Sequence, residues 1–316
     1  MLNKALKAWD QFWFSPRKLI NLGFMRLLLV GTMLHLYFMR SWNIAYFTDK
    51  SFMPRALALE SMDDFIRPTF AWFFWPDSMA GTVHGIYVLL LLLLFLGIGG
   101  RGVAIAAWVL HMGFLDRNYA AIFGADVICG VFLFYLAFTD SCARLSILNL
   151  FNRKKPIRME SDFVTSAMMR MMQFQLCIIY AYTGFEKLKG ASWWDGTALW
   201  SVLANPQMVD HDWTFLRHIP LVIAIGSFTS VIFEIYFPAA MLQPKFRKIW
   251  LIVGIFFHLT IGILMGLLHF SFVMISVYFL FMQPEFLESI LTNIKQRLKP
   301  ILNPLQDLKP SQTENF

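Results

Sequence analysis

The stretch IWLIVGIFFHLTIGILMGLLHFSFVMISVYFLFM, residues 249–282, holds 34 consecutive residues without a single Asp, Glu, Lys or Arg. One helix of that length would be about 50 Å long, whereas the hydrocarbon core of a bilayer is only about 30 Å thick. Gly262 and Gly266 lie near the centre of the stretch and are the expected turn. We therefore predict two membrane-spanning helices here, 249–265 and 268–283.

The composition of the whole chain agrees with a membrane protein. Of its 316 residues, 58% are apolar and 15% are charged, and the mean hydropathy is +0.56. A soluble domain usually has about 45–50% apolar and about 25% charged residues, so a soluble fold, intrinsic disorder and nucleic-acid binding are all poor explanations. The three cysteines have no CxxC or metal-like spacing, so we expect neither a disulfide framework nor a metal site.

The requirement of about 20 mostly apolar residues per span predicts about eight membrane-spanning helices. The fold class is therefore an all-α, polytopic helical bundle in which the lipid bilayer is the main partner. Residues 1–18 are expected to be an interfacial segment, 19–285 the membrane domain, and 286–316 a cytoplasmic, partly disordered tail. The predicted spans are 19–39, 82–100, 102–116, 119–138, 166–184, 219–242, 249–265 and 268–283.

The positive charges predict the orientation. With both termini cytoplasmic, the inner segments hold 17 of the 27 lysines and arginines and the outer segments hold 8. This distribution follows the positive-inside rule, so the net charge of +7 is explained by topology. The two long loops, 40–81 and 185–218, are then expected outside.

Ionisable residues inside predicted spans are costly and are therefore candidate functional residues. A buried Glu234 paired with either Arg26 or Arg170 is expected as a structural ion pair, because counting from the span ends puts all three at similar depth. Asp126 lies in the outer half of its span. His258 lies near mid-depth, where a lone histidine is more often a hydrogen-bonded structural residue than a functional one.

The segment GFEKLKGASWWDG, residues 184–196, is the most informative one for function. Here a helix leaves the membrane, and a glycine and a tryptophan pair follow. Lys187 at this position either extends to the interface or is held in a pocket, where desolvation makes a neutral amine available as a base.

This segment resembles the Gly-x-x-Lys-Leu…Trp…Gly stretch of vitamin K-dependent gamma-glutamyl carboxylases, and it also resembles the wider HTTM (horizontally transferred transmembrane) domain family. The resemblance covers about residues 15–285. Further motifs agree with it in the same order along the chain: Arg26, Arg117-Asn118-Tyr119, Phe123-Gly124-Ala125-Asp126, Glu234 with Phe237-Pro238, and Phe257-His258 with Gly262. One departure is Tyr119, where the carboxylases have a histidine.

The resemblance implies a site. Lys187 would be the base that deprotonates a reduced, vitamin K-like quinone, and His258 would be the second catalytic residue. Asn118, Tyr119, Asp126 and Trp194 would surround the quinone in a cavity open to the outer leaflet. The resemblance also implies a multi-pass protein of a bacterial inner membrane.

Three functions are compatible with this sequence. The first is a membrane enzyme that uses a reduced quinone. The second is a non-catalytic maturation factor or partner for an exported peptide or protein, because bacterial members of the wider family include a maturation factor for a secreted peptide toxin. The third is a transporter, which the lack of a detectable internal repeat disfavours.

Overall fold

The computed structural model describes residues 2–60, 75–151 and 156–306. These residues form helices, turns and loops, and their one β-type pairing is an isolated bridge between Lys18 and Glu160. Two compact units are distinguished, Met1–Phe281 and Met282–Phe316. The second unit contains α15 (Pro284–Gln306), so a helix occupies much of the segment expected to be a partly disordered tail.

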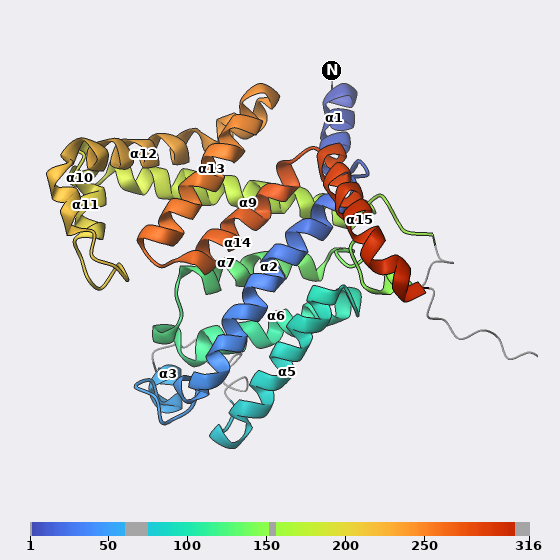
Figure 1. Ribbon diagram of the computed structural model, residues 1–316, viewed down its shortest axis with the longest axis horizontal. Coiled ribbons are helices and arrows are strands. Elements are labelled where there is room, and N and C mark those ends of the chain that lie inside the picture. The colour runs from blue at the N-terminus through green and yellow to red at the C-terminus, as the bar shows by residue number, and fades with distance from the viewer. Residues whose placement is uncertain (1, 61–74, 152–155, 307–316) are drawn as a thin grey trace, which may run out of the picture. The chain divides into compact units, whose positions relative to one another are not determined.

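Figure 1 shows the helices of the first unit. Each of the eight predicted spans coincides with one of them, and the boundaries agree best for α2 and α12. The longer helices are α1 (Leu2–Phe14), α2 (Leu19–Arg40), α5 (Asp77–Leu96), α6 (Gly100–Arg117), α7 (Gly124–Ala137), α9 (Phe163–Leu188), α12 (Pro220–Leu242), α13 (Pro244–Leu264) and α14 (Leu268–Tyr278). The short elements are η1 (Ser41–Phe47), α3 (Arg55–Glu60), η3 (Tyr119–Ala121), α8 (Leu148–Phe151), α10 (Ala191–Trp194), α11 (Ala198–Leu203), η4 (Thr214–His218) and η5 (Phe279–Phe281).

The number of helices that satisfy a membrane-span criterion is lower than eight. Within the described residues, four helical stretches are long and apolar enough by length and composition: Leu19–Phe47, Asp77–Leu96, Pro220–Leu242 and Pro244–Leu264. A fifth is reached if Leu268–Phe281 and Pro284–Ile294 are counted as one broken span. The chain is thus an all-α polytopic protein, and the count of eight spans is not confirmed.

The 34-residue apolar stretch is divided where its glycines predict. α13 ends at Leu264, and Gly266 has a φ of +69°, the left-handed conformation that favours glycine at the end of a helix. Gly262 allows α14 to pack closely, since a Cβ on it would lie 2.9 Å from the side chains of Leu268 and Ser271. The predicted turn is therefore confirmed.

α2 is the central helix of the first unit and packs against both α5 and α14 (Figure 1). Leu22, Met25 and Leu29 on α2 are fully buried. A second group is formed by α9, α12 and α13, in which α9 lies along α12. Of the candidate functional residues, Arg26 belongs to the first group, whereas Arg170, Lys187, Glu234 and His258 belong to the second. The others lie outside both groups, Asn118 and Tyr119 at η3, Asp126 on α7 and Trp194 on α10.

Candidate functional site

Lys187 near the end of α9 forms an ion pair with Glu234 of α12, with 2.6 Å between Nζ and Oε2. The lysine side chain is 20% exposed and that of Glu234 is 8% exposed, so the amine is directed towards the glutamate and both side chains are largely buried. Gly184 makes this approach of the two helices feasible, because a Cβ on it would lie 2.8 Å from Ile235. The ring of Trp193 lies 5.2 Å from the lysine Nζ.

The pairing predicted for Glu234 is therefore wrong. Arg26 donates instead to the carbonyl oxygens of Leu94, Phe95 and Leu145, and Arg170 donates to Phe12 and Gln173. Counting from span ends failed because α12 continues past the end of α9. α10 and α11 pack on the part of α12 that lies beyond α9. The Leu199 backbone N–H donates to the Ser227 hydroxyl of α12, which donates to the Gly196 carbonyl oxygen. This displacement puts Glu234 beside the last turn of α9 and within reach of the long lysine stem.

His258 belongs to a buried network with two tyrosines. The hydroxyl oxygen of Tyr180 on α9 lies 2.5 Å from His258 Nε2 on α13 and 2.5 Å from the Tyr278 hydroxyl on α14. His258 is 1% exposed, and its Nδ1 has no hydrogen-bond partner among the described residues. Ser271 donates to the backbone oxygen of His258 and fixes the position of α13 relative to α14. Aromatic rings of Phe233 and Phe237 pack against Tyr180.

Asp126 lies in a different polar cluster. Arg40 donates two hydrogen bonds to its carboxylate, at 2.6 and 2.9 Å, and the Phe123 backbone N–H donates a third. The backbone oxygen of Asp126 lies 2.9 Å from a ring nitrogen of His111, whose other ring nitrogen is 2.8 Å from the Tyr87 hydroxyl. Asp126 thus caps the first turn of α7 and connects it to α2 and α6.

Asn118 is fully buried and connects two loops. Its amide donates to the Tyr46 carbonyl oxygen at 2.6 Å and accepts from the Ala121 N–H at 3.2 Å. Tyr119 is the first residue of η3. These contacts place Asn118 with the η1 segment rather than in the Lys187 network. The roles predicted for Asn118, Tyr119 and Asp126 in quinone binding stay predictions.

Trp194 is exposed and closes the end of α9. Its indole N–H donates to the Leu188 carbonyl oxygen at 2.7 Å. The next residue, Asp195, accepts hydrogen bonds from Thr197, and these lower the pKa of its carboxyl group. Trp194 therefore fixes the segment that follows Lys187, while Trp193 supplies the ring near the amine.

Comparison with known proteins identifies the family of this chain. The family model of the HTTM domain matches residues 14–286, which is most of the chain. The chain belongs to the HTTM domain family. Together with the apolar helices, this membership identifies a multi-pass membrane protein.

Two relatives from Bacillus subtilis (strain 168) resemble part of this HTTM chain. "Sporulation-delaying protein SdpB" is 27% identical over 121 residues, and "Uncharacterized protein YitO" is 25% identical over 121 residues. The matches cover 37% and 36% of this chain and 38% of each relative. No solved structure gives a significant match.

Sequence reasoning missed two members of the His258 network. Tyr180 and Tyr278 were treated as ordinary apolar-span residues, although a buried tyrosine hydroxyl usually needs a partner. A signal was available in α9, where Tyr180, Thr183 and Lys187 recur at the helical spacing that puts them on one face. Tyr278 gave no comparable local signal, because only the packing of α14 brings it to Tyr180.

Proposed function

We propose that this HTTM chain is a membrane enzyme that uses a reduced quinone, with Lys187 as the base. The observation that carries the proposal is the ion pair between Lys187 of α9 and Glu234 of α12, two side chains that can exchange a proton. Lys187 Nζ and Glu234 Oε2 are 2.6 Å apart, and both side chains are largely removed from water. A buried ammonium and carboxylate both lose hydration, which is a cost that an ordinary surface pair does not have.

The residues of α9, α12 and α13 near the ion pair match a quinol head in chemical character. A quinol is a flat aromatic ring with two hydroxyl groups, and Phe233 and Phe237 supply apolar aromatic surface. The unpaired His258 Nδ1 supplies a buried polar atom that lacks a partner among the described residues. When bound, a reduced quinone supplies the hydroxyl proton and the electrons of the reaction.

The chain's own residues account for how a lysine becomes a base here. Transfer of a proton from Lys187 Nζ to Glu234 Oε2 gives a neutral amine and a neutral carboxyl group, which removes two charges from the helix interface. The free amine then accepts a proton from the substrate. Glu234 stores the first proton, and the surrounding aromatic side chains limit the access of water.

The test is oxidation of phylloquinone hydroquinone by the purified protein, measured as oxygen consumption. Lys187→Met is expected to lower the rate at least about 100-fold, the usual contribution of a general base. Lys187→Arg is expected to lose as much, because a guanidinium does not deprotonate near neutral pH. Lys189→Met is the matched control, since Lys189 is exposed and pairs with exposed Glu186, and it should keep the wild-type rate.

Loss of folding must be separated from loss of the base. The double variant Lys187→Met with Glu234→Leu removes both charges and should recover most of the stability that either single variant loses. A folded double variant that still oxidises the hydroquinone at the wild-type rate would refute the proposal. So would a Lys187→Met protein with unchanged activity.

The same ion pair also favours a second candidate. If Lys187 and Glu234 only hold α9 to α12, the chain serves as a non-catalytic maturation factor or partner for an exported peptide or protein. Co-purification of an exported peptide that is unchanged in the folded double variant, together with no hydroquinone oxidation by the wild type, would support this candidate.

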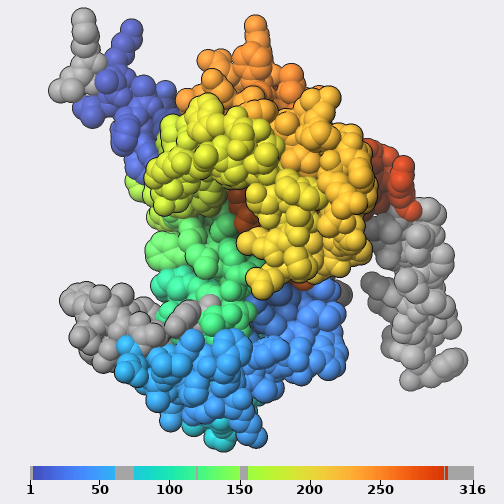
Figure 2. Space-filling view, turned by 90° about the vertical axis from the view of Figure 1, so that its left-hand side faces the viewer, coloured from blue at the N-terminus to red at the C-terminus, as the bar shows by residue number. Residues whose placement is uncertain are grey.

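For topology, we propose that the protein lies in a bacterial inner membrane with both termini cytoplasmic. Segments 41–60 (blue) and 191–218 (yellow) are both exposed on the face seen in Figure 2, which agrees with loops on one side. In a background without the native cysteines, cysteines at Lys50 and Gln207 should react with a membrane-impermeant maleimide in intact cells. A cysteine at Lys245 should react only after lysis, and its labelling in intact cells would reverse the orientation.

A further inference from the structure

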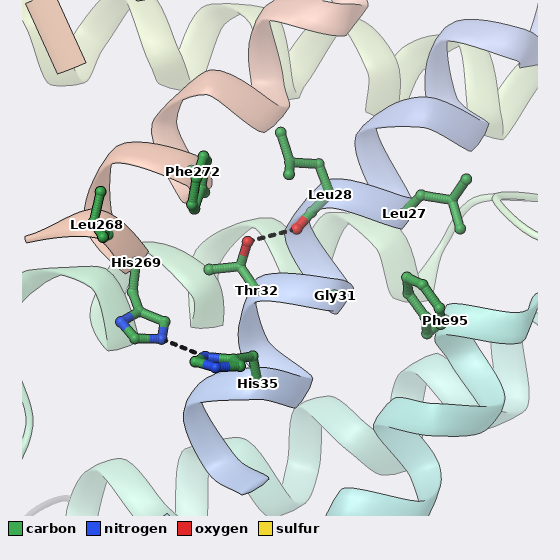
Figure 3. A pocket seen from close by; sticks show the side chains of 9 residues that line it. All are labelled: Leu27, Leu28, Gly31, Thr32, His35, Phe95, Leu268, His269 and Phe272. Atoms are coloured by element: carbon green, nitrogen blue, oxygen red, sulfur yellow. Dashed lines mark hydrogen bonds between the residues drawn. The ribbon is translucent and has the colours of Figure 1, made fainter. Parts of the chain in front are cut away.

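A pocket of about 450 Å³ lies between α2, the end of α5 and the start of α14 (Figure 3). Its volume is in the range of small-molecule sites. Most of the lining is apolar, with Phe95 and Phe272 among the contributing side chains. Gly31 keeps space beside Phe95, because a Cβ on Gly31 would lie 3.1 Å from that ring. The pocket involves neither Lys187 nor the tyrosine network.

Two histidines supply the polar end of this pocket. His35 Nδ1 on α2 and His269 Nε2 on α14 are 2.9 Å apart, and the rings lie nearly parallel with centroids 5.1 Å apart (Figure 3). The Thr32 hydroxyl hydrogen is not available to a ligand, because it is donated to the Leu28 carbonyl oxygen. His35 is exposed and His269 is partly exposed, so a ligand reaches this end from outside the helices.

The histidine contact determines what the pocket offers to a ligand. In a neutral pair, one ring nitrogen at the contact carries the hydrogen and the other accepts it. Of the two remaining ring nitrogens, one is therefore a donor and the other an acceptor. The nearby fixed charges, Arg40 and Asp126, neutralise each other in their own ion pair. The pocket thus presents a donor and an acceptor without a net fixed charge.

A carboxyl group can form a hydrogen bond with either of these nitrogens. Its O–H donates, its C=O accepts, and proton transfer to an imidazole gives an ion pair with charge-assisted hydrogen bonds. An ester or a ketone has no hydrogen to donate, and an alcohol forms no such ion pair near neutral pH. The apolar walls suit a hydrocarbon body. We propose that this pocket binds a long-chain fatty acid, with its carboxyl group on the His35–His269 pair and its chain along the apolar walls.

This inference is independent of the proposed enzyme function, and its test needs no catalytic activity. The probe is a palmitic acid that carries a photoreactive diazirine in its chain, added to the full chain in detergent. The cross-linked peptides are expected to come from α2 and α14. Unlabelled palmitate should compete at least about tenfold better than methyl palmitate or hexadecanol, the effect of losing a charge-assisted hydrogen bond.

Variants then test the two parts of the pocket separately. His35→Phe and His269→Phe should each lower labelling about tenfold or more, and Gly31→Leu should abolish it by filling the space beside Phe95. His211→Phe, in an outer loop, is the matched control and should label like the wild type. Equal competition by methyl palmitate on the wild-type protein, or cross-links outside α2 and α14, would overturn the proposal whether or not the variants fold.

Discussion

Replacing Glu234 by alanine is expected to lower the free energy of unfolding by about 3–5 kcal/mol, the usual cost of leaving one charge of a buried pair without its partner. The physical reason is that the Lys187 ammonium, 20% exposed, loses the carboxylate that lies 2.6 Å from it. The measurement is thermal or chemical denaturation of the purified protein in detergent.

The control for this prediction is the double variant that removes both charges. Lys187→Met with Glu234→Leu should recover most of the lost stability, since an apolar pair of similar volume costs little or nothing. Glu186→Ala is a second control, because Glu186 pairs with exposed Lys189 and its loss should change stability by less than about 1 kcal/mol. If the Glu234→Ala protein melted at the wild-type temperature, the ion pair would not stabilise the fold and the prediction would be wrong.

Replacing Arg26 by methionine is expected to be at least as damaging, with a loss of about 3 kcal/mol or more. The guanidinium is fully buried and donates to carbonyl oxygens at the end of α5 and in the Arg144–Leu145 segment. The bonds to Leu94 and Arg144 are buried and those to Phe95 and Leu145 are part-buried. Each buried acceptor that is left unsatisfied costs about 1–3 kcal/mol. Denaturation in the same detergent measures the loss.

Two substitutions make the Arg26 prediction specific. Arg26→Lys keeps the charge but has one compact donor group, so it should be intermediate between methionine and the wild type. Arg217→Met removes an exposed arginine of η4 and should leave stability unchanged within about 0.5 kcal/mol. If Arg26→Met were as stable as the wild type, the carbonyl contacts would contribute no net stabilisation.

The sequence by itself determined the class of protein and the positions of its helices. Apolar composition and the length of apolar runs are local properties, and they placed α2, α12 and the turn at Gly266 correctly. The motif around Lys187 was also enough to indicate the HTTM family, which the match over residues 14–286 then established. The sequence did not determine the number of membrane spans. Apolar runs predicted eight, but only four or five of the described helices are long and apolar enough to cross a membrane.

Only the tertiary structure decided which side chains meet. Depth counted along separate helices predicted that Glu234 pairs with Arg26 or Arg170, but helices slide relative to one another and α12 extends beyond α9. Lys187 therefore became the partner of Glu234, while Arg26 was used by backbone carbonyls. The tyrosine–histidine network and the His35–His269 pocket arise in the same way, since each joins residues from helices far apart in the sequence. Hydrogen bonds and ion pairs act over a few ångströms, and hydropathy alone does not fix helix register at that precision.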